Sequence, residues 1–167
     1  MLGWFTLAPA PLSDQAEAAT PAVADDAAVN GAIEKARKLS LDGDGKSMVA
    51  LLEPLEAQLR DKPDRQVAWA RVATWLADGY WRDAQRDKVA PLAEAAGKVL
   101  EGEKAQISQE GGLGLHCLGR MAKGPDERKE YNEKSLTIRE KVLGPEHPDV
   151  ADSLLNLGLV YAALDQV

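Results

Sequence analysis

Apolar residues recur every three or four positions along most of the chain, the spacing of a helix with one buried face. The first such run starts at Asp25 and places Val29, Ile33 and Ala36 on one side. Runs of the same kind occupy 46–60, 67–81, 83–100 and 106–121. Breakers such as LDGDG and DKPDR separate them. The pattern predicts a series of helices joined by short turns, with Pro54 as a local fault inside the second one.

The last part of the chain, from Tyr131 to Val167, reads as helix, turn, helix. The expected apolar stripe of the first helix is Leu136, Ile138, Val142 and Leu143. Gly144 and Pro145 end that helix, because glycine accepts a left-handed conformation and proline cannot continue the hydrogen-bond ladder. Pro148 and Asp149 then open a second helix that is apolar nearly all round.

The segment IREKVLGPEHPDVADSLLNLGLVY resembles the junction between two tetratricopeptide repeats of the kinesin-light-chain-like subtype common in bacterial proteins. The stretch VAWARVATWLADGYW resembles the first-helix signature of such a repeat, and Pro91 stands where the subtype tolerates a proline. The resemblance implies an all-α fold: a right-handed α-solenoid of antiparallel helix pairs, with about three and a half repeats and seven helices. We expect residues 25–167 to form this domain and residues 1–24, rich in Ala and Pro, to form a flexible tail.

The composition favours a helical fold and limits the classes of partner that the chain can bind. The chain is 45% hydrophobic and only 5% aromatic, and its net charge is −7. An acidic chain has no general attraction for nucleic acid, and we see no run near the roughly 20 apolar residues of a membrane span. The apolar start MLGWFTLAPAPL lacks a positively charged region and is broken by Pro9 and Pro11. We therefore expect a cytoplasmic protein, with an exported form as the weaker alternative.

The motifs that could indicate catalysis or ligand binding are incomplete in this sequence. GDGKS at 43–47 ends like a phosphate-binding loop but has Ser40 where the first glycine belongs, and a helix where a strand is needed. The spacing of Asp42, Asp44 and Glu53 is similar to that of a calcium-binding loop, but this segment lacks the glycine that such a loop needs at its sharp turn. Cys117 is the single cysteine, and its neighbour His116 would point about 100° away on a helix. The sequence thus predicts no catalytic residue, no cofactor and no metal site.

The remaining function is binding of a protein or peptide. In repeats of this family, first helices line a concave groove that holds peptide segments. Carried over helix by helix, the predicted groove residues are Arg37, Arg71, Thr74, His116, Arg120, Asp152 and Asn156. Asn156 matches an asparagine of the family motif SLNNL, and its amide can donate to and accept from a peptide unit. The three arginines would favour an acidic peptide.

The last helix has little polar surface, so we expect another helix to cover it. Its predicted contact residues are Leu154, Leu155, Leu157, Leu159, Val160 and Leu164. A natural chain that continues past Val167 into the next repeat is favoured over a homo-oligomer formed through this helix. A second function also stays open: the repeats could be the sensor or oligomerisation part of a larger enzyme or signalling protein whose catalytic part is absent.

Overall fold

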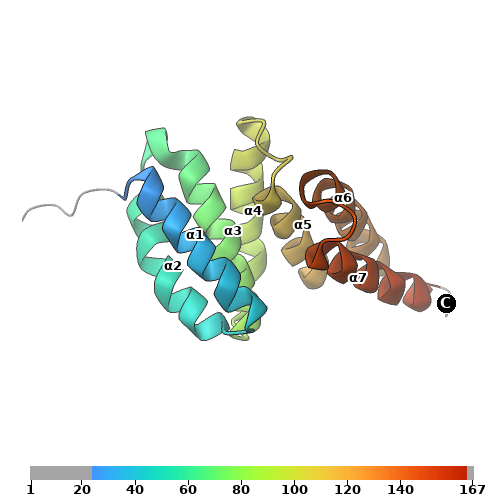
Figure 1. Cartoon of the computed structure of the whole chain (residues 1–167). Coiled ribbons are helices and arrows are strands. Elements are labelled where there is room, and N and C mark those ends of the chain that lie inside the picture. Colours follow the sequence, from blue (N-terminus) through green and yellow to red (C-terminus); the bar gives the residue numbers. More distant parts are fainter. Residues whose placement is uncertain (1–23, 165–167) are drawn as a thin grey trace, which may run out of the picture.

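The computed structural model describes residues 24–164, and these residues form seven α-helices and one short 3-10 helix (Figure 1). Most of the predicted N-terminal tail lies outside the described residues. The elements are α1 (Asp26–Leu41), α2 (Gly45–Leu59), η1 (Pro63–Arg65), α3 (Gln66–Arg82), α4 (Arg86–Gly102), α5 (Gln109–Met121), α6 (Pro125–Leu143) and α7 (Pro148–Leu164). The all-α fold predicted from the sequence is confirmed.

Short side chains and turn residues set the helix boundaries. Asp25 accepts a hydrogen bond from the Ala28 amide at 2.8 Å and so caps the start of α1. Asp44 and Ser108 cap α2 and α5 in the same way. Gly144 ends α6 at a φ of 86°, which only glycine adopts without strain. These local signals are readable in the sequence, which explains why the predicted turns coincide with the observed ones.

The helices form consecutive pairs, α1 with α2, α3 with α4, and α5 with α6, and α7 packs on α6 (Figure 1). The centre of the array is α3, because it contacts α1, α2, α4 and α5. Its side chains from Val72 to Tyr80 are all buried. Around α3 the core is filled by large apolar side chains from the neighbouring helices, among them Ile33, Leu52, Leu59 and Leu100.

The buried face of α6 differs from the predicted apolar stripe. Val142 is 41% exposed, and the buried side chains of α6 are Asn132, Ser135 and Arg139. The reason lies on α5, whose glycines leave room for polar side chains to reach its backbone: Ser135 donates to the Gly112 carbonyl at 2.8 Å. The helix also begins at Pro125, six residues before the predicted start at Tyr131.

Among the described residues, no helix combines the length and the apolar character that a membrane span requires.

Candidate functional site

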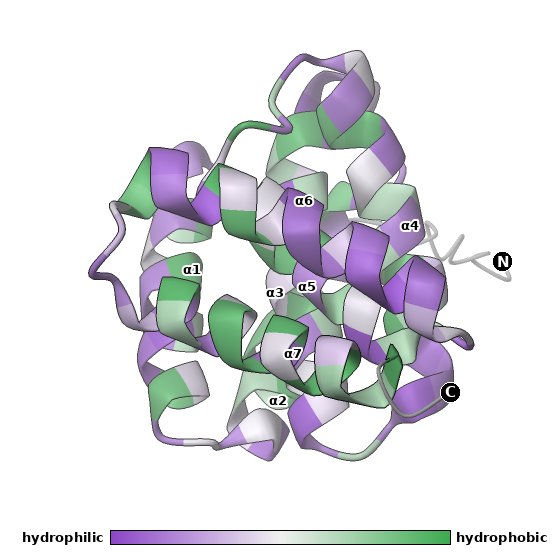
Figure 2. Cartoon of the chain, turned by 90° about the vertical axis from the view of Figure 1, so that its right-hand side faces the viewer, coloured by the Kyte–Doolittle hydropathy of each residue, from purple (hydrophilic) through white to green (hydrophobic). Residues whose placement is uncertain are grey.

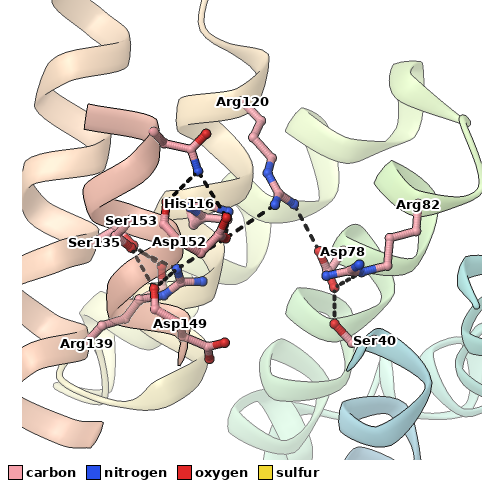
Figure 3. A network of polar contacts seen from close by, with 12 residues as sticks. Ser40, Asp78, Arg82, His116, Arg120, Ser135, Arg139, Asp149, Asp152 and Ser153 are labelled. Carbon is pink, nitrogen blue, oxygen red and sulfur yellow. Dashed lines mark hydrogen bonds and ion pairs between the residues drawn. The ribbon is translucent and has the colours of Figure 1, made fainter. Parts of the chain in front are cut away.

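The first helices of the pairs, α1, α3 and α5, together with α7, form one side of the array, which we call the first-helix face. A buried carboxylate lies at its centre: the Asp78 side chain of α3 is only 1% exposed. It accepts hydrogen bonds from Ser40 of α1 at 2.9 Å, from Arg82 at 2.7 Å and from Arg120 of α5 at 3.2 Å (Figure 3). Asp78 thereby connects three helices that are far apart in the sequence.

Arg120 extends this network from Asp78 to α7. Its second terminal nitrogen lies 3.5 Å from the carboxylate of Asp152, which also lies 2.9 Å from His116 Nε2 and 3.9 Å from Arg139 (Figure 3). The contact with His116 is the main cause that holds the pKa of Asp152 at about 2, and the charges of Arg120 and Arg139 add to it. Asp152 is therefore ionised at every physiological pH.

His116 is almost fully buried, and burial lowers the pKa of its imidazole below the usual value. Neither ring nitrogen makes a well-aligned hydrogen bond within the described part of the chain, although Nε2 lies close to Asp152. The ring is thus a neutral packing element between α5 and α7 at pH 7. The ring is not accessible to a ligand on the first-helix face, although the sequence analysis predicted His116 as a groove residue.

The predicted groove arginines all lie on the first-helix face, but each already contacts a carboxylate of the same chain. Arg37 lies 3.4 Å from Glu34, hydrogen-bonds Gln109 of α5 and lies over the Trp75 ring. Arg71 lies 3.3 Å from the buried Glu110 and donates to Asn30 of α1 at 2.9 Å. Because their charges are matched within the fold, the arginines do not make the face a positively charged surface.

Thr74 and Asn156 complete the predicted groove set. Thr74 is 1% exposed, its hydroxyl donates to the Ala70 carbonyl at 2.9 Å, and its side chain lines a cleft between α4 and α6. It is therefore buried between α3 and α5, beside Gly114, and is not accessible to a ligand on the first-helix face. Asn156 is partly exposed on α7 and donates to the Asp152 carbonyl at 2.9 Å, so its side-chain oxygen can still accept a hydrogen bond from a ligand.

Sequence reasoning missed the carboxylates that hold the arginines and the buried Arg139. Asp78 and Glu110 lie on predicted helices, and the arginines Arg120 and Arg71 that they hold are about one repeat away in the sequence. Arg139 donates to the Asp149 carbonyl and to Ser153 Oγ, both at 2.8 Å, and burial lowers its pKa. The usable signal was a polar residue inside a helical apolar face, which is expensive to bury unless it is paired.

The predicted contact residues of α7 divide into two groups. Leu157 and Val160 are buried within the chain itself, at 6% and 2% exposure, so they are not free for a partner. Leu154, Leu155 and Leu159 are 52%, 65% and 63% exposed, and Leu164 is partly exposed. Figure 2 shows α7 in front with several hydrophobic turns facing the viewer. Within residues 24–164, exposed leucines therefore remain along α7 at this end of the array.

The structure bears on the cysteine and on the histidine and carboxylate side chains that could have held a metal ion. Burial raises the pKa of the Cys117 thiol to about 12, so the sulfur stays protonated and is a poor nucleophile. Residues 24–164 contain no group of three or more His, Cys, Asp or Glu side chains placed to hold a metal ion. The His147 Nδ1 atom accepts a hydrogen bond from the Asp149 amide within the turn between α6 and α7.

Comparisons with known proteins agree with this architecture. Residues 116–149 match a family model described as "Tetratricopeptide repeat". The crystal structure of BtubC (BKLC) from P. vanneervenii matches with a TM-score of 0.60 and 18% identity. The match covers 82% of this chain and 64% of the BtubC chain, so this chain spans less than two thirds of that length. No curated protein matches the sequence. The predicted resemblance to tetratricopeptide repeats is confirmed by the family model, and the fold by the structural match.

The buried histidine predicts a dependence of stability on pH. The pKa of His116 is lower in the folded chain than in the unfolded chain, where it is about 6.5. As the pH falls through 6.5, the unfolded state takes up a proton that the folded state resists, so the free energy of unfolding decreases. Urea unfolding at pH 7.5 and pH 5.5 should show this loss in the natural protein and a smaller loss in His116→Gln. Equal losses in both proteins would show that His116 does not titrate in this way.

Proposed function

We propose that this chain is a non-catalytic protein-interaction module that holds an extended peptide segment of a partner against the first-helix face. Tetratricopeptide repeats generally mediate protein–protein interactions, and the match over residues 116–149 supports that role here. The first-helix face supports the finer statement, because it brings hydrogen-bonding side chains from four helices onto one side of the array.

The observation that carries the proposal is that buried carboxylates fix the arginines of this face. Glu110 holds Arg71, and Asp78 holds Arg82 and Arg120, yet the three arginine side chains remain 33%, 28% and 17% exposed. A guanidinium group has five N–H donors, so these contacts leave donors free. Side chains that are already ordered lose little entropy when they bind, which favours recognition by fixed hydrogen bonds.

The ion pairs between these arginines and carboxylates also limit how acidic the ligand can be. A strongly acidic peptide would have to compete with Asp78, Glu110 and Asp152 for the same arginines. A peptide of modest charge, recognised through its backbone carbonyls and one or two carboxylates, fits better. Asn156 serves the same ligand, since its amide can pair with a peptide unit.

The proposal predicts that substitutions on this face weaken binding without unfolding the chain. Peptide arrays or a pull-down with the natural protein should identify a bound segment. Arg71→Gln and Asn156→Ala should each lower its affinity about fivefold to twentyfold, because each removes one or two hydrogen bonds worth roughly 1–2 kcal/mol. Lys141→Ala, at an exposed position of α6, is the matched control and should bind normally. Ligands that bind both variants as tightly as the natural protein would remove the first-helix face from the account.

A second role, self-association through α7, is favoured by the exposure of Leu154, Leu155 and Leu159. Three neighbouring leucines in water are costly, and burying their remaining exposed surface against a second copy would recover roughly 1–2 kcal/mol per side chain. Such a contact suits an oligomerisation module of a larger assembly. It would border the first-helix face, because Leu155 and Leu159 lie within one helical turn of Asn156 on α7.

Light scattering at several protein concentrations tests this role. The natural protein should form dimers in the micromolar range, and the double variant Leu155→Glu and Leu159→Glu should be monomeric with unchanged helix content. Leu41→Glu is the matched control, because Leu41 is 74% exposed at the end of α1 and should not affect the oligomeric state. A natural protein that remains monomeric at high concentration would refute self-association.

A further inference from the structure

A cleft of about 770 Å³ lies between α4 and α6, with α5 as its floor. Leu115 and Leu118 of α5 and Ile138 of α6 provide apolar surface inside it. The cleft lies between the second helices of two consecutive pairs, and one of its lining residues, Glu110, also contacts Arg71 of the first-helix face. Its volume is within the range of known binding sites, and neither the resemblance nor the proposed function assigns it a role.

The same type of cleft occurs one repeat earlier, and there it is smaller. The cleft between α2 and α4 measures about 400 Å³ and is lined by Trp69, Leu76 and Tyr80 of α3. The lining from α5 in the later cleft consists of Glu110, Gly111 and Gly114 besides its two leucines. The second cleft is larger because α5 offers glycine where α3 offers aromatic side chains.

Two of the glycines that line this cleft are not required by packing. Packing does require glycine at two other positions of α5. A Cβ atom on Gly119, which lies outside the cleft lining, would meet the Asn132 side chain at 2.8 Å, and one on Gly111 would meet the Gln106 carbonyl at 2.0 Å. A Cβ on Gly114 would make only ordinary contact with Thr74 at 3.7 Å, and one on Gly97 of α4 would find no described atom within 4 Å. Glycine weakens a helix relative to alanine, so these two positions are explained best by the close approach of another backbone.

The rims of the cleft have the shape and charge of a helix-binding groove. On α4 the lining residues Glu94, Gly97 and Glu101 share one helix face, and on α6 Lys134 and Ile138 do. Glu94 and Glu101 flank the single Lys98 on the α4 rim, whereas Lys134 on the α6 rim lies 2.6 Å from Glu130. The charge that remains at the cleft is negative, which favours basic side chains on whatever binds there.

We propose that the cleft between α4 and α6 is a second partner-binding site, which accepts an amphipathic helix of another protein whose apolar stripe is flanked by Lys or Arg. The apolar side chains of this helix lie on Leu115, Leu118 and Ile138, and its backbone lies against Gly97 and Gly114. Its basic side chains pair with Glu94 and Glu101. Such a helix-in-groove contact is independent of the peptide on the first-helix face.

A displayed library of amphipathic helices tests the proposal, with the natural protein as bait and two sets of helices that share apolar stripes but carry Lys/Arg or Glu at the flanking positions. We expect the basic set to be enriched. The enriched helices should bind at least tenfold more weakly to Gly97→Leu and to Gly114→Ala. Both variants should melt at or above the temperature of the natural protein, because they replace helical glycines, so lost binding would not reflect unfolding.

Three controls separate this site from the others. Gly31→Leu, at an exposed glycine of α1 with no described atom near its Cβ position, should leave binding unchanged. Asn156→Ala, which alters the first-helix face but no residue of the cleft, should also leave it unchanged; helices lost with Asn156→Ala bind the first-helix face instead and overturn the proposal. Enrichment of the acidic set, or full binding to Gly97→Leu, overturns it as well. Self-association that Gly97→Leu abolishes would assign the cleft to a second copy and contradict a partner helix.

Discussion

The arrangement of the first three helix pairs depends on one buried carboxylate, that of Asp78. A charged group without partners is very costly to bury, and removal of one member of a buried ionic contact typically costs roughly 3–5 kcal/mol. Asp78 avoids that cost only when Ser40, Arg82 and Arg120 are all within hydrogen-bond distance. Because these donors come from α1, α3 and α5, the requirement restricts how three consecutive first helices can lie relative to one another. The same contacts hold the arginines of the first-helix face in fixed positions.

The second constraint comes from the glycines of α5. Gly112 and Gly119 allow α6 to approach so closely that polar side chains of α6 become buried, and Ser135 reaches the Gly112 carbonyl. Gly111 and Gly114 leave the cleft between α4 and α6 open. One short helix with little side-chain volume therefore determines both the packing of the third pair and the hollow on its outer side. A row of larger residues at these positions, as in α3, would close both features.

What could be predicted from the sequence was local. Capping residues, the DKPDR breaker and the GPEHPD turn act over a few positions, and they place the helices correctly, as the turn at Gly144 shows. The side of α6 that is buried could not be predicted, because the polar residues Asn132, Ser135 and Arg139 are buried only in the presence of glycines on another helix. The pairing of Arg71 and Arg120 with Glu110 and Asp78 joins positions about one repeat apart, so no pattern within one helix reveals it. The burial of Thr74 could not be predicted for a similar reason, because it depends on the close approach of Gly114 on another helix.

The central claim, that Asp78 holds α1, α3 and α5 together, is tested most directly by amide hydrogen exchange in Asp78→Asn, compared with Asp61→Asn at an exposed position. The amide retains the size of the carboxylate but loses its charge, so the contacts with Arg82 and Arg120 weaken. The account predicts faster exchange in the last turns of α1 and α5, around Ser40 and Arg120, as well as in α3, while the exchange of α7 beyond Leu157 stays as in the natural protein. Faster exchange confined to α3, or none at all, would contradict it.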